Sequence, residues 1–442
     1  MAHYTIEGGF SLHGSVVAAG AKNVTLPMMA AAILTEEPVT LLRTPQLTDV
    51  SIMAELLRRL GVEVEKGTGS FCPAEEKEPT PTDGKRCLSP FLTLQTIDHR
   101  PVRADYELLR KMRAGFCVLG PLLVRRGHAE VAMPGGCSIG DRPVDLHLKG
   151  FEKLGATISI EHGYVVARAK RLRGTTIDMA GPHGPTVTGT IHLLSTATLA
   201  EGRTTILGAA IEPEVTEVGK MLVRMGANIS GLGSSTLHID GVERLTGVQQ
   251  QVIFDRIEAA TLLFAAAITS GRVTVCDVLP EMLAEPLAML RKCGCTVDVE
   301  TDRVTVSREA GPLRPVDLRA EPYPGMPTDL QAQWMALMTQ AEGVSTICDH
   351  VFPGRFMHVA ELRRLGARIE HLDGPAVVHG PVRLEGADVT ATDLRAGAAL
   401  VLAGLVAEGT TRVFGLEYLD RGYDRLDEKL ASLGAKIRQE ES

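Results

Sequence analysis

The chain has 442 residues, of which 44% are hydrophobic, 23% charged and 4% aromatic, and its formal net charge is −8. This length exceeds what one hydrophobic core usually supports, so we expect a folded, non-fibrous protein of two domains. The acidic balance and the few aromatic residues argue against nucleic acid or an anionic membrane surface as a partner.

The N-terminal segment and the cysteines exclude further classes of protein. Residues 1–7 lack the basic segment and the apolar segment of a signal sequence, and the apolar run 26–34 is too short to span a bilayer. We therefore expect a cytoplasmic protein without membrane insertion. The eight cysteines show no C-x-x-C spacing, which argues against a zinc site and against a disulfide framework. Cys293 and Cys295 are interpreted as packed thiols.

The first candidate site follows a turn of small residues at 18–21. Lys22 and Asn23 stand just before a predicted apolar helix, where an ammonium group and backbone N–H groups can converge on an anion. The alternative is that Asn23 caps the helix and that Lys22 is solvated.

A tripeptide centred on glycine recurs six times, each time after a segment with apolar residues at helical spacing. The copies are Leu60-Gly61-Val62, Leu154-Gly155-Ala156, Met225-Gly226-Ala227, Cys293-Gly294-Cys295, Leu365-Gly366-Ala367 and Leu433-Gly434-Ala435. We interpret each copy as a helix that ends at a glycine cap and turns into a strand. Six such units predict an α/β protein with two domains of three units each.

The spacing of the six glycines also predicts an insertion. Successive glycines are 94, 71, 68, 72 and 68 residues apart, so the first interval is the longest. The excess falls in residues 67–101, and the proline-rich, charged run around 79–84 is interpreted as a solvated surface loop.

A glycine-rich loop at 133–145 contains one thiol, Cys137, and one guanidinium, Arg142. A thiol on such a loop near a cation is a candidate for a lowered pKa and for nucleophilic or acid chemistry. The alternative is a structural cysteine that acts as a small packed hydrophobe.

Further along the chain, Asp329 follows a proline-rich segment and stands at the entry to a predicted helix, where plain N-capping is the alternative. Asp393 with Arg395, and Asp420 with Arg421, each place an Arg close to an Asp at a predicted strand-to-helix junction. Surface ion pairs would give the same pattern.

The candidate cations stand at or near unit junctions of an otherwise acidic chain. They are Lys22, Arg113, Arg142, Arg395 and Arg421. Converging cations of this kind suit a multiply charged anion.

Taken in order, these strings resemble the UDP-N-acetylglucosamine enolpyruvyl transferases, and the resemblance runs nearly end to end. The matching segments are 20–23, 111–114, 119–122, 134–147, 211–214, 255–258, 327–329, 355–359, 393–395 and 420–423. The resemblance implies two inverse α/β barrel domains of three units each. One would comprise residues 22–253 and the other residues 1–21 with 254–442, with both substrates bound in the cleft between them.

The resemblance also implies a reaction and its residues. The enolpyruvyl group of phosphoenolpyruvate would pass to the 3′-hydroxyl of UDP-N-acetylglucosamine, without metal or organic cofactor. Cys137 resembles the proton donor towards C3 of phosphoenolpyruvate, and Asp329 resembles the base at the sugar hydroxyl. The groups around phosphate and carboxylate would be Lys22, Asn23, Arg142 and Arg421. The contacts to the UDP-sugar would be Arg113, Pro143, Val144, Asp145, Leu146, Thr186, Val187 and Val351, with Asp393, Leu394 and Arg395 closing on the reacting centre.

Two alternatives stay open on the sequence. The first is a shikimate-pathway enolpyruvyl transferase, which resembles the same fold and uses the same donor. The second is a non-catalytic, regulatory paralogue that binds a UDP-sugar or a partner protein. The segments at 134–137 and 143–146 favour the UDP-sugar, and the joint presence of Cys137, Asp329, Lys22 and Arg421 favours an enzyme.

Overall fold

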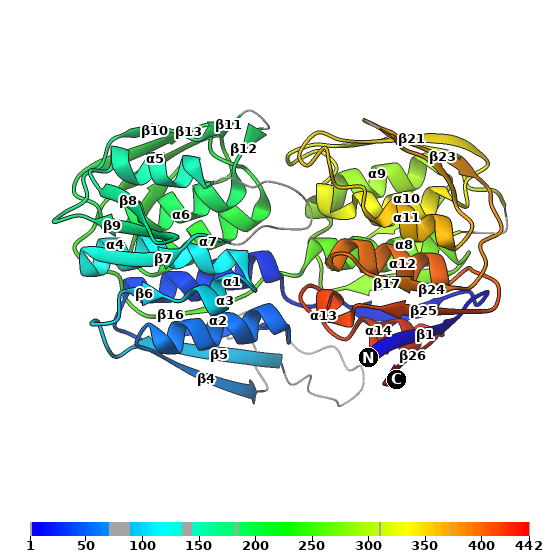
Figure 1. Ribbon diagram of the computed structural model, residues 1–442, viewed down its shortest axis with the longest axis horizontal. Helices are drawn as coiled ribbons and strands as arrows, with labels where there is room; N and C mark the ends of the chain where they lie inside the picture. The colour runs from blue at the N-terminus through cyan, green and yellow to red at the C-terminus, as the bar shows by residue number, and fades with distance from the viewer. Residues whose placement is uncertain are drawn as a thin grey trace.

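The computed structural model describes residues 2–69, 89–134, 144–181, 184–308, 311–372 and 374–441. These residues form two lobes, each with its own hydrophobic core (Figure 1). The core of the first lobe lies within residues 21–252, and the core of the second lobe draws on residues 4–18 and 254–437. The chain therefore begins in the second lobe, crosses into the first and returns.

Six four-stranded sheets share one plan, in which two parallel strands are followed by two antiparallel partners. The first lobe has three of these sheets. The strand order of one is β16 (Val248–Gln251), β3 (Val39–Leu42), β5 (Ser89–Thr96) and β4 (Val62–Gly69), and that of the second is β6 (Arg103–Ala104), β7 (His128–Ala132), β9 (Tyr164–Arg168) and β8 (Thr157–Glu161). The order of the third is β10 (Thr176–Asp178), β13 (Arg203–Leu207), β15 (Thr236–Asp240) and β14 (Asn228–Ser230). The second lobe has the other three sheets. The strand order of one is β2 (His13–Val17), β17 (Arg272–Cys276), β19 (Arg303–Ser307) and β18 (Thr296–Val299), and that of the second is β20 (Leu318–Ala320), β21 (Gly343–Asp349), β23 (Ala376–Gly380) and β22 (Arg368–Glu370). The order of the third is β24 (Asp388–Thr390), β25 (Thr410–Phe414), β1 (Ala2–Glu7) and β26 (Lys436–Glu441). A small additional sheet pairs β11 (Ala180–Gly181) with β12 (Gly184–Pro185).

Three apolar helices fill the middle of each lobe. They are α1 (Lys22–Ala31), α4 (Leu119–Arg126) and α6 (Val187–Ala197) in the first lobe, and α8 (Arg256–Ile268), α10 (Gln331–Met338) and α12 (Leu394–Gly404) in the second. Most of their residues are buried, as expected for helices that are hydrophobic on nearly every face. Figure 1 shows these helices inside and the sheets towards the outside of each lobe. This arrangement confirms the predicted α/β class.

A second set of helices is amphipathic and leads into the predicted tripeptides. These helices are α2 (Thr48–Arg59), α5 (Asp145–Lys153), α7 (Pro213–Arg224), α9 (Ala284–Lys292), α11 (His358–Arg364) and α14 (Leu426–Ser432). The glycine after each one has a φ angle between 82° and 102°, the left-handed region in which glycine closes a helix without strain. The six-fold repeat predicted from the sequence is therefore confirmed.

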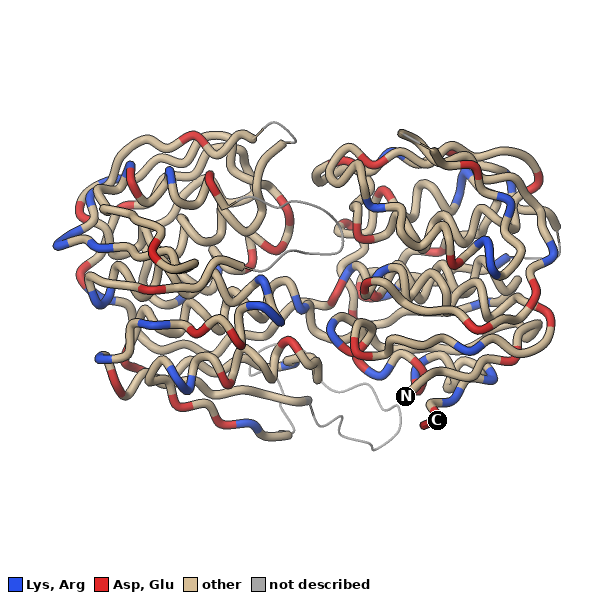
Figure 2. Tube along the Cα trace, viewed as in Figure 1, with Lys and Arg blue, Asp and Glu red and all other residues tan. Residues whose placement is uncertain are grey.

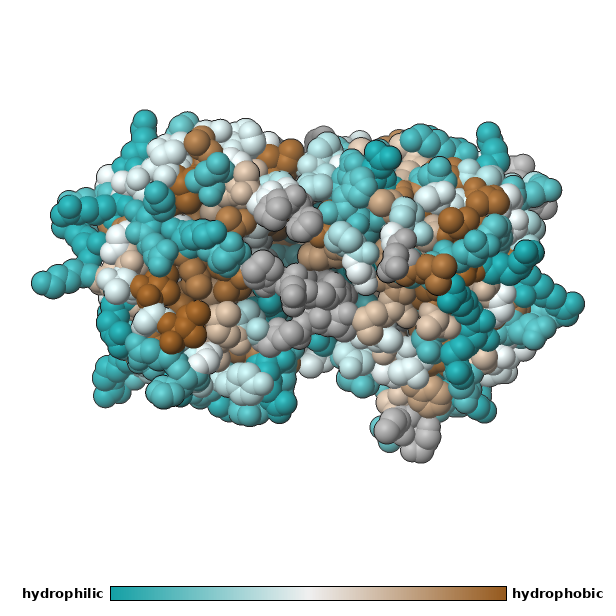
Figure 3. Space-filling view, turned by 45° about the horizontal axis from the view of Figure 1, so that its top comes forward, coloured by the Kyte–Doolittle hydropathy of each residue, from teal (hydrophilic) through white to brown (hydrophobic). Residues whose placement is uncertain are grey.

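Shorter elements complete the fold. They are α3 (Tyr106–Leu109), α13 (Leu416–Leu419), and the 3-10 turns η1 (Ala32–Leu34), η2 (Arg113–Val118), η3 (Pro280–Leu283) and η4 (Thr328–Leu330). Within the described part of the chain, every helix falls short of the length and apolar character that a bilayer crossing requires. Figure 3 shows charged and polar side chains over the outer ends of both lobes.

The expected surface loop at 67–101 is partly wrong. Residues 62–69 and 89–96 are the strands β4 and β5, which pair as an antiparallel hairpin in register from Val62 with Thr96 to Gly69 with Ser89. Leu92, Leu94 and Thr96 are buried on one face, and this alternation was the signal for a strand. The run around 79–84, on which the loop interpretation rested, lies outside the described residues.

Candidate active site between the two lobes

A buried carboxylate joins cations from the two lobes. Asp49, in the first turn of α2, accepts a hydrogen bond from Arg421 Nε of the second lobe at 2.9 Å and lies 3.4 Å from Lys22 Nζ of the first lobe. The Asp49 side chain is only 3% exposed. Burial lowers the pKa of Lys22, and the neighbouring Asp49 charge opposes this shift.

Backbone contacts hold the start of α2 against the turn that carries Arg421. The N–H of Thr48 donates to the carbonyl of Asp420 at 3.0 Å, and the N–H of Gln46 donates to Asp424 Oδ2 at 3.1 Å. Figure 1 shows α13 at the side of the second lobe that faces the first lobe. Arg421 lies in this turn between α13 and α14, so the predicted strand-to-helix junction is wrong for Arg421. The cause is the short helix α13, which intervenes after β25.

A second buried carboxylate, Asp329, lies in the 3-10 turn η4 that leads into α10. Its Oδ2 accepts from Arg395 Nη2 at 2.9 Å, and its Oδ1 accepts from Arg355 Nη1 at 2.8 Å. Both arginine side chains are almost fully buried, at 2% and 4% exposure. Burial alone would raise the pKa of Asp329, but the Arg395 and Arg355 charges hold it well below its usual value.

These contacts exclude plain helix capping as the only role of Asp329. The residue that precedes η4 in the cap position is Pro327, and both oxygens of Asp329 are occupied by guanidinium groups. The carboxylate is therefore ionised and fixed in orientation, which suits an acceptor of a hydrogen bond at a defined position.

Asp393 places Arg395 for this contact. It is the N-cap of α12, where its Oδ1 accepts from the backbone N–H of Arg395 at 2.7 Å and of Ala396 at 3.2 Å. The predicted strand-to-helix junction between β24 and α12 is thus present. The Arg395 guanidinium also lies over the Tyr423 ring, 5.3 Å from its centroid, in a cation–π geometry.

The two carboxylate clusters belong to one charged region. The charges of Arg395 and Arg421 lower the pKa of Lys22, after the larger effect of burial, and the charge of Asp329 raises it. Figure 2 shows charged residues of both lobes gathered where the lobes meet. A region with several cations that are only partly neutralised is suited to a multiply charged anion.

Several other predicted residues lie at the starts of helices in the first lobe. Asp145 and Leu146 begin α5 directly after Val144, and Val187 begins α6. The hydroxyl of Thr186 caps α6 by accepting from the N–H of Gly189 at 3.1 Å. These helix starts present backbone N–H groups, which can bind phosphate oxygens.

The remaining predicted residues are more dispersed. Arg113 begins η2, and Leu394 begins α12. Asn23 is exposed on α1, whose cap position is occupied by Ala21, so the capping alternative for Asn23 is wrong. The N–H of Val351 donates to Asp349 Oδ1 at 2.9 Å, in the second lobe.

Three predicted residues, Cys137, Arg142 and Pro143, lie outside the described residues. Among the residues that are described, no group of three or more His, Cys, Asp or Glu side chains is arranged to hold a metal ion.

Sequence reasoning missed Asp49 and gave no role to Arg355. A signal for Asp49 did exist, because it falls on the same helical face as the buried Met53, Leu56 and Leu57. A carboxylate in an apolar stripe needs a buried partner, and here the partners are Lys22 and Arg421.

We expect Asp49→Asn to raise the KM for the anionic substrate by about tenfold, since loss of a charge-assisted hydrogen bond of this kind costs about 1.5–3 kcal/mol. The substitution removes the charge that orients Lys22 and Arg421 but keeps the shape of the side chain. Steady-state kinetics measure the change, with Asp388→Asn, which alters an exposed pair with Arg412, as the control. An unchanged KM would contradict this role.

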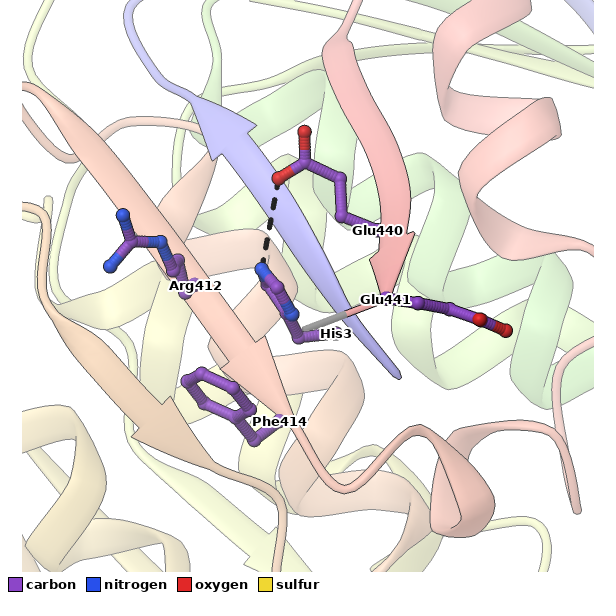
Figure 4. Close-up of a pocket in the computed structure, with 5 residues that line it drawn as sticks. All are labelled: His3, Arg412, Phe414, Glu440 and Glu441. Carbon is purple, nitrogen blue, oxygen red and sulfur yellow. Dashed lines mark ion pairs between the residues drawn. The ribbon is translucent and has the colours of Figure 1, made fainter. Parts of the chain in front are cut away.

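A surface pocket elsewhere takes in none of these residues. His3, Arg412, Phe414, Glu440 and Glu441 line it on the outer sheet that contains β25, β1 and β26 (Figure 4). The His3 ring is stacked on Phe414, with centroids 4.8 Å apart, and its Nε2 lies 3.7 Å from Glu440 Oε2. We assign this pocket no chemistry.

Comparison with known proteins agrees with this geometry. Residues 6–85 and 93–430 match the family described as EPSP synthase (3-phosphoshikimate 1-carboxyvinyltransferase), and the chain belongs to this family. Within it, the chain is 46% identical to the UDP-N-acetylglucosamine 1-carboxyvinyltransferase of Methylacidiphilum infernorum, over 99% of this chain and 98% of the relative. It is 48% identical to the protein of the same name from Chlorobaculum parvum, again over 99% and 98%.

Solved structures show the same fold. The enolpyruvyl transferase NikO from Streptomyces tendae is similar with a TM-score of 0.84 and 28% identity, covering 99% of this chain and 98% of that one. EPSP synthase from Acinetobacter baumannii is similar with a TM-score of 0.70 over the full length of both chains, and at 16% identity it supports the fold alone.

Proposed function

We propose that this protein transfers the enolpyruvyl group of phosphoenolpyruvate to the 3′-hydroxyl of UDP-N-acetylglucosamine and releases phosphate. The observation that carries the proposal is the 46–48% identity, over nearly the whole chain, to relatives named for this reaction. The cations at the junction of the lobes support it, because they suit a donor with several negative charges. The reaction is the first committed step of peptidoglycan biosynthesis and thereby serves cell-wall formation, cell shape and division.

The first half of the reaction is an addition. The sugar oxygen forms a bond to C2 of phosphoenolpyruvate while its proton passes to Asp329, and C3 gains a proton from Cys137. An acid and a base on opposite sides of the reacting group are what this step requires. The two guanidinium groups that hold Asp329 support its role, since they fix the carboxylate ionised and aimed.

The second half is an elimination from the tetrahedral intermediate. C3 returns a proton to the Cys137 thiolate, the bond from C2 to the phosphate oxygen breaks, and phosphate leaves with the electron pair and the proton that Asp329 had taken up. Lys22, Asn23, Arg142 and Arg421 stabilise the charge that develops on the leaving group. The residues assigned to the UDP-sugar are Arg113, Pro143, Val144, Asp145, Leu146, Thr186, Val187 and Val351. Asp393, Leu394 and Arg395 close on the reacting centre.

The cleft between two domains holds both substrates in this proposal. The domains comprise residues 22–253 and residues 1–21 with 254–442. The separate cores support these boundaries, and so do the two crossing segments, which lie side by side. The N–H of Ala21 donates to the carbonyl of Ile253, and the N–H of Asp255 donates to the carbonyl of Ala19, both at 2.8 Å.

We place the reaction in the cytoplasm, where phosphoenolpyruvate is produced. Unpaired cysteines support this location, because free thiols persist in a reducing compartment. Cys117, Cys276, Cys293, Cys295 and Cys348 are all free thiols.

A phosphate-release assay tests the function. Purified protein with phosphoenolpyruvate and UDP-N-acetylglucosamine is expected to release phosphate, and omission of either substrate is expected to abolish the signal. Turnover with shikimate 3-phosphate in place of the UDP-sugar would assign the shikimate-pathway reaction instead. Binding of UDP-N-acetylglucosamine without any phosphate release would identify a non-catalytic protein.

We expect the epoxide phosphonate fosfomycin to alkylate Cys137 and inactivate the protein, more rapidly when UDP-N-acetylglucosamine is present. The phosphonate should bind the cations that hold phosphate, which brings the strained ring to a thiol activated by nearby positive charge. Peptide mass mapping locates the adduct. Inactivation of a Cys137→Asp variant at the wild-type rate would contradict the assignment.

A further inference from the structure

Two buried histidines connect the helices that begin at the predicted UDP-sugar contacts. His147 lies two residues after the start of α5, and His192 lies five residues after the start of α6. Their Nδ1 atoms are 3.1 Å apart, and the side chains lie among the rings of Phe116 and Phe151. The two residues are 5% and 1% exposed. The proposed mechanism uses neither histidine.

The backbone of a third helix settles which nitrogens carry protons. The N–H of Gly120, in the first turn of α4, donates to His192 Nε2 at 2.7 Å. A nitrogen that accepts a hydrogen bond carries no proton, so the proton of neutral His192 is on Nδ1. His192 Nδ1 therefore donates to His147 Nδ1, and the proton of neutral His147 is on Nε2.

Burial keeps both rings neutral, as this assignment requires. Burial first, and then the Arg113 charge, lowers the pKa of His147 to about 4, and burial lowers that of His192 well below its usual value. The position of the donor, the backbone N–H of Gly120, is also constrained, because a side chain at position 120 would collide with His192 and Thr196. Glycine at 120 is what allows the backbone N–H to reach the ring.

We propose that His192 is a positioning residue for the UDP-sugar. The ordered pair of hydrogen bonds from Gly120 through His192 to His147 fixes the start of α5 relative to the start of α6. It also leaves His147 with its donor on Nε2, the side of the ring away from His192. The inference rests on the proposed function, because these helix starts carry Asp145, Leu146, Thr186 and Val187.

Two substitutions of His192 separate this role from simple core filling. In His192→Asn the amide nitrogen takes the place of Nδ1 and can still donate to His147. In His192→Gln the terminal amide takes the place of Nε2 and can still accept from Gly120, while the bond to His147 is lost. We expect the Kd and KM for UDP-N-acetylglucosamine to rise by about tenfold or more in the Gln variant and by less than about threefold in the Asn variant. The KM for phosphoenolpyruvate should stay within about twofold in both.

The matched control is His238→Gln, which changes a half-buried histidine of the same lobe that pairs with Thr205. Its Kd for the UDP-sugar should equal that of the wild type. Equal losses in the two His192 variants, better binding by Gln than by Asn, or no loss in either would overturn the proposal. Calorimetry measures binding of the UDP-sugar directly and does not depend on turnover. A wild-type protein that fails to bind UDP-N-acetylglucosamine would refute the proposed function and not the role of His192.

Nitrogen NMR of 15N-histidine-labelled protein reads the tautomers without any ligand. His147 should show a protonated Nε2 and an unprotonated Nδ1, and His192 the reverse, with the signals assigned from the two variants. The His147 signature should persist in His192→Asn and change in His192→Gln. A protonated Nδ1 on His147 of the wild type would overturn the proposal.

Discussion

Asp329→Asn is expected to lower kcat by about a hundredfold or more, because a positioned general base contributes about 10²- to 10⁴-fold. Asparagine keeps the size of the side chain and one acceptor oxygen, but it cannot take the proton of the sugar hydroxyl. Substrate binding should largely persist, since the assigned role lies in proton transfer. Steady-state kinetics with saturating concentrations of both substrates measure the loss.

The same substitution should lower the Tm, because two buried guanidinium groups lose the charge that faces them. Cooperative melting at a reduced Tm would show that the lost kcat does not reflect an unfolded protein. Asp317→Asn is a suitable control in the same lobe, because that carboxylate accepts an exposed backbone hydrogen bond from Thr346, remote from the two guanidinium groups. Turnover of Asp329→Asn at the wild-type rate would remove Asp329 from the mechanism.

Arg421→Ala is expected to raise the KM for phosphoenolpyruvate by about tenfold to a hundredfold, because charge-assisted hydrogen bonds contribute about 1.5–3 kcal/mol. The guanidinium is partly exposed and paired with Asp49, so its remaining donors can reach a bound anion. The KM for the UDP-sugar should change much less. The increase in the KM for phosphoenolpyruvate also depends on how closely the lobes approach each other, since Arg421 belongs to the second lobe and Asp49 to the first.

The control for Arg421 is an exposed arginine on the outer sheet of the same lobe. Arg412→Ala removes an exposed pair with Asp388 and should leave both KM values unchanged. Equal increases of the two KM values in Arg421→Ala would indicate a general loss of lobe closure in place of a specific contact to the donor.

The sequence predicted the repeating elements because their signals are local. A glycine that closes a helix in the left-handed region is a property of a few consecutive residues, so the six tripeptides could be recognised without any tertiary information. The β4–β5 hairpin was partly missed because its strands flank a charged, proline-rich run. That run dominated the composition of the interval and concealed the alternation at 92–96.

The site was predictable only in part, for a physical reason. Lys22, Asp329 and Arg395 follow local patterns of helix starts, and the structure brings these three into one charged region. Which charged groups pair with one another could not be read from the chain. Asp49 and Arg421 are 372 positions apart, and such a pairing depends on how two separately folded lobes meet. The histidine pair was missed because His147 and His192 are 45 positions apart, and only the packing of α5 against α6 within the first lobe brings them together.

The position of β1 has a consequence for how the chain is made. This strand pairs with β25 on one side and β26 on the other, so β1 leaves the ribosome long before either of its partners. At about 5–20 residues per second, β1 waits about 20 to 80 seconds for them. The first lobe, whose core ends at residue 252, can close during that interval while the second lobe cannot. Biosynthesis thus separates in time the folding of the two halves, and β1 can be paired on both sides only after β26 has been made.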